Sequence, residues 1–360
     1  MAYNIYEWKI NPKSSFMTKL QSDTIWGHII WAIRYLEGEE YLENILEQFE
    51  DNNSPFIVSN GFISGYLPFI KKGIVSTRGI KSILSKKNNL TKQNIKLYTR
   101  LVDEFNKIEF IDTETFNTLR KDELMSLYSD VANSKRCPIT LRKFEFEHKQ
   151  ALHLYFKSPE EYKREDNVTT YNDLVKTQSL TKNKINRLTN SSEQDDGSGV
   201  FTVYETFYKS SISIYIKLRD DVDVEKFNTY LKYIQQNGFG KKASSGKGYF
   251  ETVSFEKRED LFDSQYEGNG YVVLSNYIPK QGDYSDVVGV SLLTKRGKVS
   301  GIYSQNENIF KKPFVCFTPG SVFKGNPNLN KGKMLKGLYY DEKIVQYGIP
   351  FILGVDINDK

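Results

Sequence analysis

The chain has 360 residues but only two cysteines, Cys137 and Cys316. Neither has a partner at metal-ligand spacing, so the sequence predicts no zinc site and no disulfide framework. It has no run near the roughly 18 apolar residues of a membrane span, and its N-terminus opens without an apolar signal region. We therefore expect a cytoplasmic protein in a reducing compartment, with no metal, no cofactor and no membrane contact.

Histidine is also scarce, with three residues: His28, His148 and His153. A metal-free ribonuclease needs a histidine or a similar general base near the attacking 2′-hydroxyl. His28 is the one candidate, although its place beside the apolar stripe of a predicted helix also fits a structural histidine. The other two fall in strand-like alternation. We expect no catalytic residue, and hence a protein that is not an enzyme.

Charge is present in quantity and is segregated along the chain. The net charge is +5, yet acidic residues gather over residues 37–51, whereas residues 71–100 contain basic residues and neither Asp nor Glu. Residues 176–187 form a second basic stretch that contains neither Asp nor Glu. A charge run is usually a solvated face, but basic runs interleaved with Tyr, Phe and Asn favour a nucleic-acid groove. We expect the acidic segment to face solvent or a basic protein partner.

A glycine-rich segment at residues 237–248 combines lysines, serines and glycines. It satisfies the dinucleotide pattern formally, but that pattern needs a strand before it and a helix after it, and here the predicted order is reversed. It is not a P-loop either, because Gly248 follows Lys247 where Ser or Thr is required. Main-chain donors and positive charge suit a phosphate backbone. A plain solvated loop is the alternative.

The periodicity of the N-terminal part predicts an α+β domain. Residues 3–10 alternate like a strand and lead to a helix that Asp23 or Thr24 would cap. The apolar face of this helix comprises Ile25, Ile29, Ile33 and Leu36. Three further elements are a half-buried strand at 212–218, an amphipathic helix at 223–236 and a strand at 249–255. This β-α-β…β-α-β order predicts a ferredoxin-like domain over residues 1–255.

A large insertion at residues 71–200 interrupts that domain. We expect its first part to be mostly helical, residues 139–156 to alternate as strands, and the polar residues 158–200 to form a long loop or an arm. Strand-like segments dominate residues 269–360. They predict a smaller β-rich domain that packs beside the first.

Four segments of the chain together resemble the RAMP superfamily of CRISPR-associated RNA-binding proteins. Within it they resemble the subunit type that caps the 5′ end of the guide RNA in type III-A interference complexes. The segments are Leu20–His28, Lys182–Thr189, Asn237–Tyr249, and the pair Lys295–Lys298 with Lys312–Phe323. The glycine-rich loop is shared by all RAMP proteins, whereas the four segments in this order are more specific.

The resemblance implies two ferredoxin-like (RRM-like) halves that face each other, with the 5′ handle of the guide RNA across the cleft. The segment before the first helix would contact handle bases through Ser14, Lys19, Ser22 and Asp23. An arm that reaches the guide–target duplex would contribute Lys184, Asn186 and Arg187. The glycine-rich loop would contribute Gly238, Gly240, Lys241, Lys242, Ser244, Ser245, Gly246 and Lys247, and the C-terminal half Lys295 and Arg296.

The resemblance also implies the partners: the guide RNA, indirectly the target RNA, a large polymerase-like subunit and a backbone RAMP subunit. The expected function is that of a non-catalytic RNA-binding subunit that bridges those two proteins in antiviral defence. The alternatives are a metal-independent endoribonuclease that processes the guide precursor through His28, and a general single-stranded RNA binder. Lys182 departs from the His or Arg that usually opens the arm motif, and the basic stretch 71–100 has no counterpart in the resemblance.

Overall fold

In the computed structural model, the larger sheet has four antiparallel strands in the spatial order β10-β1-β9-β2. These strands are β1 (Tyr3–Pro12), β2 (Phe56–Ile63), β9 (Ile212–Arg219) and β10 (Phe250–Lys257). Helices follow the first and third of them along the chain, so the order of elements is the β-α-β…β-α-β order that the sequence predicts.

The structure describes residues 2–73, 78, 81, 109–121, 174–185, 190–194, 197–258, 261–262, 266–299, 301–305, 308–327 and 330–357. The predictions for most of the basic insertion, for the alternating segment with His148 and His153, and for Cys137 lie outside these residues.

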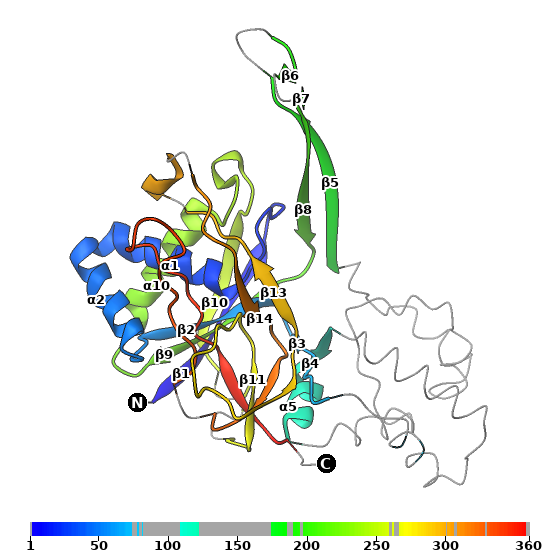
Figure 1. Cartoon of the computed structure of the whole chain (residues 1–360), viewed down its shortest axis with the longest axis vertical. Coiled ribbons are helices and arrows are strands. Elements are labelled where there is room, and N and C mark those ends of the chain that lie inside the picture. Colours follow the sequence, from blue (N-terminus) through cyan, green and yellow to red (C-terminus); the bar gives the residue numbers. More distant parts are fainter. Residues whose placement is uncertain are drawn as a thin grey trace.

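Two helices cover one face of the larger sheet (Figure 1). They are α1 (Ser22–Glu37) and α10 (Val224–Asn237), and the acidic α2 (Glu39–Glu50) follows α1. The predicted stripe of α1 holds except at Leu36, which is 47% exposed. The predicted cap of α1 is wrong: the N-cap is Gln21, whose side chain makes no capping bond, and Asp23 and Thr24 lie inside the helix. The N–H of Ser22 donates to Asn60 Oδ1.

The C-terminal half is built of short strands, as predicted. A second antiparallel sheet has the order β12-β15-β11-β16, and β13 pairs with β14. Their bounds are β11 (Gly270–Val273), β12 (Asp286–Gly289), β13 (Leu292–Lys295), β14 (Phe314–Phe317), β15 (Val322–Lys324) and β16 (Ile352–Val355). The described part of this half contains a 3-10 turn, η2 (Gly301–Gln305), and no α-helix.

The second sheet packs against the other face of the first sheet, so the two halves share a hydrophobic core. Ile5 and Tyr215 of the first sheet meet Val272 and Leu353 of the second in this core. The short helix α5 (Thr113–Lys121) closes the core from the side, next to the paired strands β3 (Tyr66–Pro68) and β4 (Phe110–Asp112). The prediction of a half-buried β9 is therefore wrong, because both its faces are covered.

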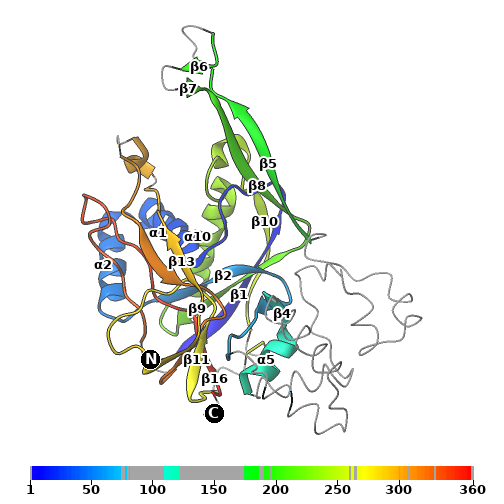
Figure 2. The ribbon, with the colours of Figure 1, turned by 45° about the vertical axis from the view of Figure 1, so that its right-hand side comes forward.

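A long two-stranded hairpin projects from this body (Figures 1 and 2). It consists of β5 (Val175–Asn183) and β8 (Val200–Tyr208), with the short β6 (Glu193–Gln194) and β7 (Gly197–Ser198) near its tip. We call this hairpin the arm. Of the two alternatives for residues 158–200, a long loop or an arm, the described part forms an arm. The strand β5 itself was not predicted, because its polar residues pair through the main chain and bury almost no side chain that would produce an alternating pattern.

Candidate nucleic-acid interface

The glycine-rich loop begins where α10 ends, and it folds back on itself. Asp223 caps the start of α10 by accepting the N–H groups of Glu225 and Lys226. At the other end, Gly238 takes a φ of +77° and its N–H donates to Ile234 O. The N–H of Phe239 then donates to Gly248 O over 2.9 Å, and the Phe239 side chain is buried. The loop therefore has a fixed base and an apolar anchor.

Two glycines are required because the main chain passes close to neighbouring atoms. Gly240 has a φ of +78°, and a Cβ there would lie 2.5 Å from Thr18. Gly248 has a φ of +66°, and a Cβ there would lie 2.0 Å from Phe239 O. Both positions combine the left-handed conformation with a steric block, so only glycine fits without movement.

The loop docks on the segment between β1 and α1, the other segment for which the resemblance implies RNA contacts. The N–H of Lys241 donates to Thr18 Oγ1 over 2.8 Å. Further along, the N–H of Gly248 donates to Ser15 O over 2.9 Å and that of Tyr249 donates to Ser14 Oγ over 2.8 Å. Ser14 is therefore part of the support of the loop.

His28 supports the loop from beneath. The N–H of Gly240 donates to His28 Nε2 over 3.1 Å, and the imidazole lies 4.5 Å from the Phe239 ring, centre to centre. Burial lowers the pKa of His28 to about 4. The neutral ring is the form that can accept this bond, so the nitrogen that a general base would use is already engaged with the main chain.

The ammonium of Lys247 is drawn into an ion pair with Glu205 of the arm. Lys247 Nζ lies 2.6 Å from Glu205 Oε2 and 2.9 Å from Ser15 Oγ, which itself donates to Glu205 Oε2. The Glu205 side chain is 1% exposed, and Lys182 Nζ lies 3.7 Å from its other oxygen. The hydrogen bond from Lys247 holds the pKa of Glu205 below its usual value. This cluster ties the loop to the arm.

The outer rim of the loop remains exposed. Lys241, Lys242, Ser244 and Ser245 face solvent there, and Ala243–Ser245 form a single 3-10 turn that Lys242 enters with a φ of +66°. Lys19 is exposed on the segment that carries the loop. The rim thus offers positive charge and hydroxyl groups on a main chain that hydrogen bonds to His28 and Thr18 hold in place.

The arm presents a second exposed surface. Tyr204 is 67% exposed, Phe201 42% and Phe207 38%, although all three lie on a strand. The main chain of Thr206 bonds to Phe16 in both directions, over 2.8 Å each, and so attaches the base of the arm to the loop support. Lys184 is exposed beyond the end of β5. The predicted Asn186 and Arg187 lie outside the described residues.

The residues predicted at the start of α1 and in the C-terminal half bind each other. Asp23 accepts from Lys295 Nζ over 2.5 and 2.7 Å and from Gln346 Nε2 over 2.9 Å. Ser22 is buried and its Oγ accepts the N–H of Asn276 over 3.0 Å. These contacts join the two halves. Arg296 is exposed, with its guanidinium 4.7 Å from the centre of the Phe310 ring.

Sequence reasoning missed two residues that organise this surface. Glu205 is the one acidic residue within a strand otherwise made of apolar, aromatic and Thr residues. This isolated charge is the sequence feature that could have indicated a buried ion pair. Thr18 has no such signal, since only the folded chain brings it against the loop. The described residues contain no cluster of His, Cys, Asp and Glu that could hold a metal, and none of their helices is long and apolar enough to cross a membrane.

The larger sheet is built from two β-α-β units, and a glycine-rich loop joins the helix of the second unit to its last strand. The fold is therefore of the mixed α and β class, with a polar loop that hydrogen bonds from neighbouring segments hold in place. The model of the RAMP superfamily matches residues 13–251. The chain belongs to the RAMP superfamily, and the resemblance noted in the sequence is confirmed. No curated protein matches the chain significantly.

Solved structures of similar fold span the whole chain. One comes from the Csm3-Csm4 subcomplex of the type III-A CRISPR-Cas interference complex, with a TM-score of 0.58, 15% identity, and coverage of 98% of this chain and 99% of that one. Another comes from the Csm1-Csm4 cassette in complex with pppApA, with a TM-score of 0.52, 16% identity and 100% coverage of both chains. At this identity the likeness is one of fold.

Proposed function

We propose that the protein is a non-catalytic RNA-binding subunit of a type III-A CRISPR effector complex. In this role it holds the 5′ handle of the guide RNA and bridges the large polymerase-like subunit to the backbone RAMP filament. The finer architecture, two ferredoxin-like halves with RNA across the cleft between them, belongs to the same proposal. Family membership and the fold shared with chains solved alongside Csm1 and Csm3 support it.

The main observation in favour of the proposal is that the glycine-rich loop is fixed by hydrogen bonds while its basic rim is exposed. Lys241 and Lys242 supply phosphate affinity, and the hydroxyls of Ser244 and Ser245 supply hydrogen bonds that can read base edges. Because Thr18 and His28 hold the main chain beneath them, the loop gives up little conformational entropy on binding. Exposed aromatic residues on the arm add stacking surfaces for unpaired bases.

The test compares RNA binding by the full chain and by the Lys241→Met/Lys242→Met variant, over a range of salt concentrations. For a single strand, the salt slope should fall by about 0.7 for each phosphate that the variant no longer neutralises. The matched control is Lys336→Met/Lys343→Met, which removes two exposed lysines that pair with acidic residues of α2. A slope that is unchanged in the loop variant would refute the interaction of this loop with the RNA backbone.

The handle and bridging roles need a second experiment. A guide that carries the repeat-derived 5′ handle should bind more tightly than the same RNA with a scrambled handle, and the protein should copurify with a polymerase-like subunit and a backbone RAMP subunit. Equal affinity for both RNAs would favour a general RNA binder.

The absence of catalysis is tested separately, by incubating the protein with labelled repeat RNA and no metal. We expect intact RNA. Specific cleavage that His28→Ala abolishes would establish the endoribonuclease alternative.

A further inference from the structure

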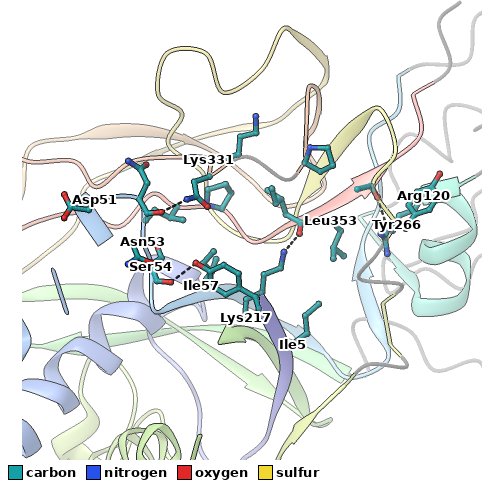
Figure 3. Close-up of a pocket in the computed structure, with 18 residues that line it drawn as sticks. Ile5, Asp51, Asn53, Ser54, Ile57, Arg120, Lys217, Tyr266, Lys331 and Leu353 are labelled. Carbon is teal, nitrogen blue, oxygen red and sulfur yellow. Dashed lines mark hydrogen bonds between the residues drawn. The ribbon is translucent and has the colours of Figure 1, made fainter. Parts of the chain in front are cut away.

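A cavity of about 750 Å³ lies between the larger sheet and the C-terminal half (Figure 3). None of its described lining residues belongs to the candidate RNA interface. Apolar side chains line it from both halves, among them Ile5 of β1, Ile57 of β2 and Leu353 of β16, and the rings of Tyr3 and Tyr266 add to this lining. A cavity of this size suits a small organic ligand, because ligand pockets are typically about 300–1,000 Å³.

Lys217 carries a positive charge into this cavity from the C-terminal part of β9. Its Nζ donates to Ile352 O over 2.8 Å and lies 5.1 Å from the centre of the Phe351 ring. In the part of the chain that the structure describes, no carboxylate lies within ion-pair distance of this ammonium. Burial lowers the pKa of Lys217 to about 8, so the side chain is still mostly protonated at neutral pH. Lys217 is partly buried, and a cation that is largely removed from water without a counter-ion is costly.

The other charges around the cavity are mostly positive too. Arg120 of α5 is 1% exposed, and its Nε donates to Gly354 O over 2.9 Å. The buried Lys331 also lines the cavity, although its Nζ bonds to the carbonyl of Asp283. Asp51 is the one carboxylate among the described lining residues, and it is exposed. An anionic ligand would therefore bind at Lys217, which has no carboxylate partner among the described residues.

We propose that this cavity binds a small phosphorylated molecule, with its phosphate against Lys217 and its organic part along the isoleucine and tyrosine wall. A phosphate would supply the counter-ion that Lys217 lacks and would accept charge-assisted hydrogen bonds. The room beyond one phosphate group, together with a lining that has both polar and apolar side chains, makes an organic phosphate such as a nucleotide the better fit.

Calorimetric titration of the full chain tests this, with AMP, inorganic phosphate and adenosine as probes at matched ionic strength. We expect saturable binding of AMP and none of adenosine, and Lys217→Met should weaken AMP binding by at least about tenfold. Lys241→Met/Lys242→Met is the matched control, because it removes two lysines from the RNA loop, and it should bind AMP like the wild type. Tighter binding of AMP than of inorganic phosphate would indicate a nucleotide, and equal binding would indicate free phosphate.

Three results would overturn the proposal: no saturable binding of either phosphate probe, equal affinity in Lys217→Met, or weaker binding only in the loop variant. Hydrogen exchange on the wild-type protein provides a measurement that does not depend on the folding of a variant. AMP should protect the segments 51–54 and 349–354, which line the cavity from opposite halves. Protection confined to residues 237–248 would refute the site.

Discussion

The side chain of His28 and the main chain of Gly240 are joined by a hydrogen bond of 3.1 Å, in which the amide donates to Nε2. The two residues are 212 positions apart. The helix of the first β-α-β unit thereby positions the loop of the second. One of the three histidines of this chain thus has a structural contact at the surface that we propose for RNA.

Acidification should destabilise the protein through His28. The pKa of the folded-state imidazole, about 4, lies below the ordinary value of 6.5. Between these two values the unfolded chain takes up a proton that the folded chain excludes, so stability should fall as pH drops through this window. Urea unfolding at pH 7 and pH 5 measures the change. His28→Gln, which keeps an acceptor but does not titrate, should show a smaller difference, and an identical difference would contradict the assignment.

Alanine should be tolerated unequally at three glycines of the loop that share the left-handed conformation. Gly240→Ala and Gly248→Ala add a Cβ against Thr18 and against Phe239 O, whereas a Cβ on Gly246 meets nothing within 4 Å. We expect Gly246→Ala to cost about 1–2 kcal/mol, the penalty of that conformation alone, and the other two to cost more. Denaturant unfolding of the three variants checks the order. Equal destabilisation of all three would mean that the steric contacts do not matter.

Glu205 and Lys247 should be energetically coupled. Their atoms lie 2.6 Å apart, and the carboxylate is almost completely buried. A double-mutant cycle with Glu205→Gln and Lys247→Met should give a coupling free energy of about 1–3 kcal/mol, as expected for a hydrogen bond to charged groups. A value near zero would show that the cluster does not hold the loop. The cycle with the exposed pair Lys343 and Glu43 should give a clearly smaller coupling, because solvent screens both charges.

Tyr204 should contribute to RNA binding and little to stability. Its side chain is 67% exposed on the arm, so Tyr204→Ala removes few internal contacts. If a base stacks on it, RNA affinity should fall by about 1–3 kcal/mol in the variant at an unchanged melting temperature. Tyr340→Ala is the control, since Tyr340 is 70% exposed in the C-terminal half. Equal affinity of both variants for RNA would remove the arm from the interface.

The helices and strands of the body were largely predictable because their apolar residues recur with the period of the element. The strand β9 and the helix α10 show this plainly, and the glycine-rich loop followed from the order of elements around it. The strand β5 was not predictable, because its side chains are mostly polar and exposed and its only regularity is main-chain pairing with β8. The covered outer face of β9 was missed because the second sheet lies far along the chain.

The identity of the loop as a donor-rich, positively charged bend is a local property, and the amino-acid order around residues 237–248 determined it. Which of its lysines remain exposed was decided by tertiary contacts. Lys247 is occupied because Glu205, 42 residues earlier, is carried to it by the arm, just as Lys295 is occupied by Asp23, 272 residues away. Periodicity and turn chemistry act over a few residues, whereas an ion pair depends on where two distant segments meet.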